Sequence, residues 1–146
     1  MTKQTDELTL YHFTCEHGKR GIDLTRILLP NMHPFMKSLG PLLWLTDFAE
    51  PPTPESVGLQ STWMTCDRLA YRYIVRTHAA VPWSEVRAKA RADVVATFEA
   101  GRMPEHWYVA RRPLTSSEFT FDESYTRKKN VNEDTTTPVQ TADQLD

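Results

Sequence analysis

Five short stretches of apolar and β-branched residues predict the strands of a sheet. Residues 8–13 and 71–77 alternate loosely between two faces, and 42–46 is a continuous apolar run between Pro41 and Asp47. Alternation is typical of a strand with one buried face, whereas a continuous run is typical of a strand buried on both faces. Two further strands are expected late in the chain, at 107–110 and 118–121.

A short helix is expected directly after the first strand. It begins near Thr14 or Cys15 and continues to about Ile27. Gly18 and Gly21 lower its helix propensity, so its limits are weakly defined by the sequence.

A longer helix is expected over residues 85–100. Ser84 precedes it as a candidate N-cap, and Gly101 follows it in the position where helices often end. Apolar residues recur about every four positions and would form its buried face: Val86, Ala90, Val94, Val95 and Phe98.

Prolines indicate loops between these elements. Residues 31–41 contain two prolines and Gly40, and residues 48–58 contain three prolines. Pro82 ends the strand region that precedes the second helix, and residues 59–65 fit neither a helix nor a strand pattern.

The order of elements predicts the fold class. Strand, helix, strand, an undefined stretch, strand, helix, strand and strand favour a small α+β domain over a regularly alternating parallel sheet. We expect one domain over residues 1–125. Residues 126–146 are rich in Asn, Asp, Thr, Gln and Pro, which predicts a disordered tail because such a segment buries little apolar surface.

The charge and cysteine content limit the class of protein. The 17 basic and 19 acidic residues give a net charge of −2, which argues against general attraction to nucleic acid or anionic membranes. Arg68, Arg72 and Arg76 still leave a local nucleic-acid interface open. No secretion signal and no membrane-spanning run of ~20 apolar residues is visible, which predicts a cytoplasmic protein. Cys15 and Cys66 are then expected as free thiols, with a disulfide between them left open.

The residues that suggest chemistry lie on the first strand. Tyr11-His12-Phe13-Thr14 is followed by a helix, a proline-containing loop and the run Leu43-Trp44-Leu45-Thr46-Asp47. This arrangement resembles the opening of ADP-ribosyltransferase-like domains, including tRNA 2′-phosphotransferases and DNA-modifying toxins of toxin–antitoxin pairs. The resemblance covers about the first 47 residues and extends loosely to the later strands. It implies a split β-sheet that binds NAD and transfers ADP-ribose to a protein or nucleic-acid acceptor.

The resemblance implies two catalytic residues. His12 would hold the ribose next to nicotinamide, a role suited to a neutral imidazole because the ring offers one donor and one acceptor. Glu118, at the start of the last strand, would orient a ribose hydroxyl and stabilise an oxocarbenium-like transition state. Asp122 and Glu123 are rivals for that role. A histidine bonded only to backbone and an exposed carboxylate at a strand end are the alternatives.

Five further residues are candidates for contact with NAD. Thr14 would bind the ribose or cap the following helix, and Tyr11 lies beside His12 on the strand. Trp44 and Tyr73 would stack on a planar ring or belong to the core. Arg72, together with Arg68 and His78, would hold a phosphate.

Several expected motifs are missing from the sequence. It contains no clear Ser-Thr-Ser motif and no Glu-x-Glu pair. The lack of a clearly assigned catalytic carboxylate favours the alternative function, a non-enzymatic regulator of phage or mobile-element origin that binds a partner. No Gly-x-Gly-x-x-Gly or Walker pattern is present, which argues against Rossmann and P-loop domains. His12, Cys15 and His17 lack the paired spacing of a zinc site, so no metal is expected.

Overall fold

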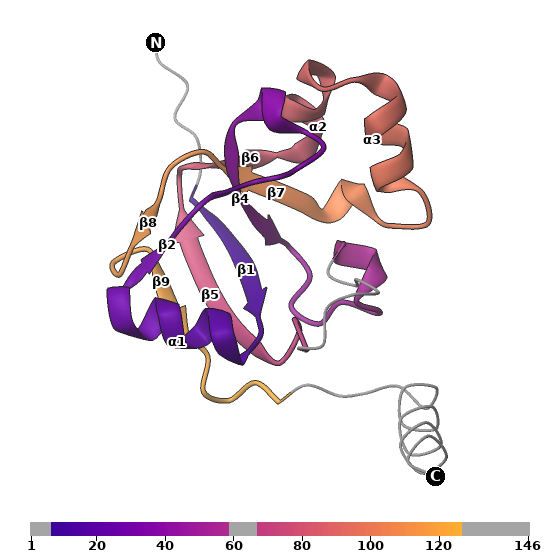
Figure 1. The fold of residues 1–146 in the computed structure, drawn as a ribbon. Helices are drawn as coiled ribbons and strands as arrows, with labels where there is room; N and C mark the ends of the chain where they lie inside the picture. Colours follow the sequence, from indigo (N-terminus) through magenta and orange to yellow (C-terminus); the bar gives the residue numbers. More distant parts are fainter. Residues whose placement is uncertain (1–6, 59–66, 127–146) are drawn as a thin grey trace, which may run out of the picture.

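The sheet of this α+β protein is antiparallel throughout its described pairings (Figure 1). The computed structural model describes residues 7–58 and 67–126. The strand order is β6-β7-β4-β1-β5-β9, with β3 on β4, and β2 pairs with β8 in a separate ribbon. The strands are β1 (Leu8–Thr14), β2 (Ile27–Leu28), β3 (Asn31–Met32), β4 (Pro41–Thr46), β5 (Tyr71–Thr77), β6 (Ala80–Pro82), β7 (Trp107–Ala110), β8 (Leu114–Thr115) and β9 (Phe119–Phe121).

The helices lie at two separate ends of this sheet. Figure 1 shows α1 alongside β1 and β5, and α2 and α3 near β6 and β7. The α-helices are α1 (Glu16–Thr25), α2 (Trp83–Val86) and α3 (Ala92–Glu99), and the 3-10 turns are Lys37–Leu39, Glu55–Val57, Arg87–Lys89 and Pro104–His106.

Two clusters of buried apolar side chains pack against the sheet. One joins β1, β4 and β5 to the β2–β8 ribbon through residues such as Leu10, Leu45 and Val75, which are at most 4% exposed. The other contains Trp83 and Trp107 together with Leu42, Val86, Val95 and Val109. Each cluster removes apolar side chains from water on its own side, which is the main favourable term in folding.

The sheet splits between β1 and β4. β1 pairs with β5 at seven positions, from Leu8 opposite Thr77 to Thr14 opposite Tyr71. Its described register with β4 has a single pair, Tyr11 opposite Thr46. The sheet therefore consists of two halves, β6-β7-β4 and β1-β5-β9, joined over a short distance.

The prediction of one helix over residues 85–100 was wrong. The chain forms α2, a 3-10 turn and α3, with extended backbone at Ala90 (ψ 164°) and Arg91 (ψ 133°) between them. Val86 and Val95 are both buried in the same cluster. Nine residues correspond to two and a half helical turns, so a continuous helix would direct these two side chains to opposite sides. The break allows both to reach the core. Ser84 lies within α2 and Pro82 occupies the N-cap position, so the predicted cap was also wrong.

Smaller differences concern the predicted loops. Residues 31–41 include β3, and Pro82 lies at the end of β6 rather than interrupting it. β6 is an edge strand, where proline is tolerated because its missing N–H faces no partner strand. Gly101 follows α3 with φ 73°, as predicted. The ambiguous stretch 59–65, Cys66 and the predicted disordered tail after Thr126 lie outside the described residues.

Candidate functional site

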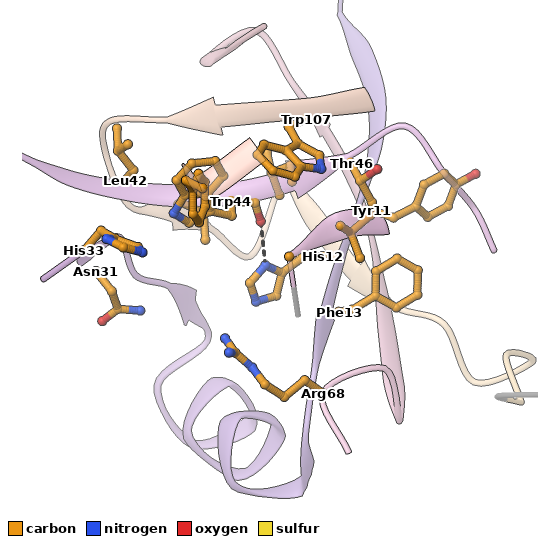
Figure 2. Close-up of a pocket in the computed structure, with 15 residues that line it drawn as sticks. Tyr11, His12, Phe13, Asn31, His33, Leu42, Trp44, Thr46, Arg68 and Trp107 are labelled. Atoms are coloured by element: carbon orange, nitrogen blue, oxygen red, sulfur yellow. Dashed lines mark hydrogen bonds between the residues drawn. The ribbon is translucent and has the colours of Figure 1, made fainter. Parts of the chain in front are cut away.

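A cavity of about 270 Å³ lies where the sheet splits (Figure 2). Its walls come from β1, β3, β4, β7, α3 and the segment around Arg68. His12 lies at the junction of the two halves. It comes directly after Tyr11, the β1 residue that pairs with Thr46 of β4, and its ring contacts the backbone of Trp44.

The His12 ring is fixed by the backbone of β4. Its Nδ1 lies 3.1 Å from the carbonyl oxygen of Trp44. A carbonyl oxygen only accepts, so Nδ1 carries the proton and donates. In the neutral ring Nε2 is then an acceptor. Figure 2 shows this second nitrogen facing the side of the cavity from which Arg68 enters.

His12 is neutral at physiological pH. Burial lowers the pKa of its imidazole, and the positive charge of Arg68 lowers it further, against the opposing effect of the Trp44 carbonyl. The ring therefore offers a lone pair to the cavity instead of a second N–H. An imidazole in this state accepts a hydrogen bond from a hydroxyl group of a ligand.

An aromatic wall forms the side of the cavity away from Arg68 (Figure 2). Trp44, Phe98 and Trp107 all line it, and their ring centroids lie 5.2 to 6.0 Å apart. His33 extends the wall, with its ring 5.1 Å from that of Phe98. Flat apolar rings of this kind suit a planar heterocycle.

Arg68 is the cation among the described residues that line the cavity, and none of these residues is acidic. The charge at the site is therefore positive, which suits an anionic ligand such as a phosphate ester.

The structure brings together only part of the predicted site. His12, Tyr11 and Trp44 line the cavity. Trp44 also packs against the buried cluster that contains Trp83 and Trp107. Tyr73 is 1% exposed, and its hydroxyl group donates to Asp23 of α1 at 3.2 Å. Burial of this hydroxyl, with Asp23 beside it, raises the Tyr73 pKa. Tyr73 is thus a core residue that holds α1 to β5.

Arg72 and Thr14 also lie outside the cavity lining. Arg72 donates to Asp122 and to the carbonyl oxygen of Ala49, so its guanidinium joins β5 to two loops. Thr14 makes no N-cap hydrogen bond to α1, whose N-cap is Cys15. Its side chain lies over Gly18, where an added Cβ would come within 1.9 Å of the Thr14 hydroxyl oxygen. The cap predicted for Thr14 was therefore wrong.

Glu118 is at the far end of β5 from His12. His12 lies opposite Tyr73, whereas Glu118 accepts a hydrogen bond from Thr77 at 2.7 Å and its backbone carbonyl accepts from Arg76. Its carboxylate also pairs with Arg112 at 2.8 Å. The hydrogen bond from Arg112 is the main reason that the Glu118 pKa falls to about 2, and Thr77 contributes further. Glu118 stabilises the β8–β9 turn in its ionised form. The geometry does not bring it to the cavity.

Protonation of Glu118 is expected to destabilise the protein in acid. Because its folded-state pKa is depressed, the stabilisation is present above about pH 4.5 and is lost as the pH falls towards 2. We expect about 1–2 kcal/mol, because half-exposed Arg112 is partly screened by water. Glu118→Gln should flatten this part of the curve when urea unfolding is measured from pH 6 to pH 2.

Glu85→Gln is the matched control, because Glu85 is exposed on α2. It should leave the acid limb unchanged. An acid limb that is the same in Glu118→Gln and the wild type would contradict the structural role of Glu118.

Some residues of the cavity were not predicted for it. Asn31 lines it from β3, and His33, Phe98 and Trp107 come from three other segments. In the sequence His33 lies in a proline-rich loop and Phe98 on a predicted core face, and nothing local connects either with His12. The pairing of β3 and β7 with β4, and the packing of Phe98 of α3 against Trp44 and Trp107, bring them near it.

Searches of protein-family models, curated proteins and solved structures find no match to this chain. Within residues 7–58 and 67–126, no group of three or more His, Cys, Asp or Glu side chains is placed to hold a metal ion. Over the same residues, no helix has the length and apolar character needed to cross a membrane.

Proposed function

We propose that this protein binds NAD at the split of its sheet and acts as an ADP-ribosyltransferase-like protein on a protein or nucleic-acid acceptor. The observation that carries the proposal is the position of His12. A neutral imidazole, held by the Trp44 carbonyl, directs its acceptor nitrogen into a cavity that also contains Arg68. A ribose hydroxyl would donate to His12, while a phosphate of the dinucleotide would lie towards Arg68.

The aromatic wall supports the same ligand. Nicotinamide is a planar ring, and Trp44, Phe98 and Trp107 provide flat apolar surfaces on one side of the cavity. A pocket of this kind, mostly apolar with a few directed polar groups, is typical of small-molecule sites. Its volume of about 270 Å³ is near the lower end for such sites, so it suits the nicotinamide-ribose half of NAD, with the adenosine half outside.

Replacing His12 with alanine tests this proposal. We expect NAD to bind at least tenfold more weakly to His12→Ala, because the ribose loses its acceptor and the Trp44 carbonyl loses its donor. Calorimetric titration of NAD would measure the loss, and release of nicotinamide would report turnover in parallel. Thermal unfolding of each variant would show that it is folded.

His17→Ala is the matched control, because His17 is an exposed histidine on α1. It should bind NAD like the wild type. Unchanged NAD affinity in His12→Ala would remove His12 from the site.

The alternative function is a non-enzymatic regulator that binds a protein partner. Two observations favour it. None of the described cavity residues supplies a carboxylate, which an ADP-ribosyltransferase reaction would use to stabilise its transition state. Large apolar side chains are also exposed between residues 24 and 35, with Leu24 at 85% and Phe35 at 72% exposure. These side chains follow one another along the chain from α1 to the segment after β3, and exposed large apolar side chains are available for contact with a partner. NAD binding without any nicotinamide release would favour this function.

The nucleic-acid interface suggested by Arg68, Arg72 and Arg76 has less support. Arg72 is committed to Asp122, and Arg68 lines the cavity. Of the three, only Arg76 is exposed. One such cation is a weak basis for attraction to a phosphate backbone.

A further inference from the structure

Two histidines line the cavity, and the backbone fixes them in opposite hydrogen-bonding states. His12 donates from Nδ1 to the Trp44 carbonyl oxygen at 3.1 Å. His33 does the reverse, because its Nδ1 accepts from the backbone N–H of Phe35 at 3.1 Å. An N–H only donates, so Nδ1 of His33 carries no proton. In neutral His33 the proton is therefore on Nε2.

His33 is held by a different part of the chain from His12. Its ring meets Phe98 of α3 edge to face at 5.1 Å and lies 5.9 Å from the ring of Phe35. It is half-buried, and this burial lowers the pKa of its imidazole. Figure 2 shows His33 and Asn31 together on one side of the cavity, apart from His12 and Arg68.

The cavity thus offers an acceptor and a donor from the same type of side chain. His12 presents a lone pair at Nε2, and His33 presents an N–H at Nε2. We propose that His33 determines ligand specificity by donating this hydrogen bond to an acceptor oxygen on the planar end of the ligand, which in NAD is the carboxamide oxygen of nicotinamide. The inference rests on the proposed function. It adds His33, which directly follows β3, as the residue that recognises the end of the ligand away from the ribose hydroxyl.

The two histidines respond differently to acid. Protonation of His12 converts its only free acceptor into a donor, and so removes the bond to a ribose hydroxyl. Protonation of His33 keeps the N–H at Nε2, while the Phe35 N–H loses its acceptor. Arg68 is the charged side chain among the described residues that line the cavity with both rings. NAD affinity should therefore fall in acid with the protonation of His12, and this fall should persist in variants of His33.

A cycle of protein and ligand changes tests the role of His33. Thionicotinamide adenine dinucleotide replaces the carboxamide oxygen with sulfur, a weaker acceptor. The wild type should bind NAD several-fold more tightly than this analogue. His33→Leu should bind NAD roughly tenfold more weakly than the wild type and lose the preference between the two ligands. His33→Gln, which keeps an N–H donor, should recover part of both. His17→Leu is the control, and calorimetric titration gives each affinity.

The ring states can be measured without a ligand. Nitrogen-15 NMR of the free protein should show the proton on Nδ1 in His12 and on Nε2 in His33. The opposite state in either ring overturns the inference, as does a preference for NAD over the thio analogue that is unchanged in His33→Leu. If the wild type binds NAD and His33→Leu binds it equally well, the inference fails and the proposed function stands. If the wild type binds no NAD at millimolar concentration, both fail.

Discussion

Trp83→Ala is expected to lower the free energy of unfolding by about 3–5 kcal/mol, the typical loss for a large aromatic side chain deleted from a core. Trp83 is 1% exposed and its ring lies 5.0 Å from that of Trp44 and 6.3 Å from that of Trp107. Its indole N–H also donates to Glu99 at 2.6 Å, which links α2 to α3. Removal of the ring therefore leaves a cavity and takes one donor from the Glu99 carboxylate, which keeps its ion pair with Arg87. Urea unfolding followed by circular dichroism would measure the change.

Phe35→Ala is the control for this experiment. Phe35 is 72% exposed, so its removal should change stability little. A loss below about 1 kcal/mol in Trp83→Ala would show that α2 and α3 are not held by this ring. Because Trp44 also lines the candidate site, the proposed binding of NAD should be weaker in the destabilised variant than in the wild type.

Asp122→Ala is expected to cost about 3 kcal/mol, because it leaves the Arg72 guanidinium buried without its anion. The Arg72 side chain is 15% exposed and that of Asp122 is 9% exposed. Arg72 also lies over the ring of Tyr125 at 4.5 Å and donates to the Ala49 carbonyl oxygen at 2.7 Å. The pair thus connects β5 to the segment that follows β9 and to the loop after β4. Urea unfolding at neutral pH would measure the loss.

The double variant Arg72→Met, Asp122→Ala gives a second reading. It should lose less stability than the sum of the two single variants, because no charge is then left buried alone. Arg20→Ala breaks an exposed pair with Glu16 and should have no measurable effect. Strict additivity of the Arg72 and Asp122 variants would contradict a direct interaction between these residues.

The strands were predictable because their signal is local. β1, β4, β5 and β7 lie within about a residue of the ranges expected from alternation and apolar runs. The segment 85–100 was predicted wrongly for the opposite reason. Its apolar residues fit a helical period, but burial of both Val86 and Val95 in one cluster depends on Trp83 and the sheet, and no local period contains that information.

The candidate site was predictable only where it lies in one stretch of chain. Tyr11 and His12 were predicted for the site because they are adjacent in the motif Tyr11-His12-Phe13-Thr14, and both line the cavity. Glu118 was predicted for the site from its place at the start of the last expected strand. The register of β9 on β5 decides its actual position, because Phe119 pairs with Val75 and Glu118 therefore lies beside Thr77 instead of Tyr73. His33 reaches the site through contacts with Phe98 that span 65 positions of sequence, beyond what pattern reading detects.

The seam between β1 and β4 makes the cavity and the stability of the sheet interdependent. Among the described pairs, only Tyr11 and Thr46 align across it, whereas a continuous pair of strands would form a bond at every second residue. A ligand bound beside His12, as proposed, would contact both halves and add to the few backbone hydrogen bonds between them. Its binding would then raise the free energy of unfolding by mass action. In this architecture the ligand would connect the two halves of the sheet where few strand pairs do so.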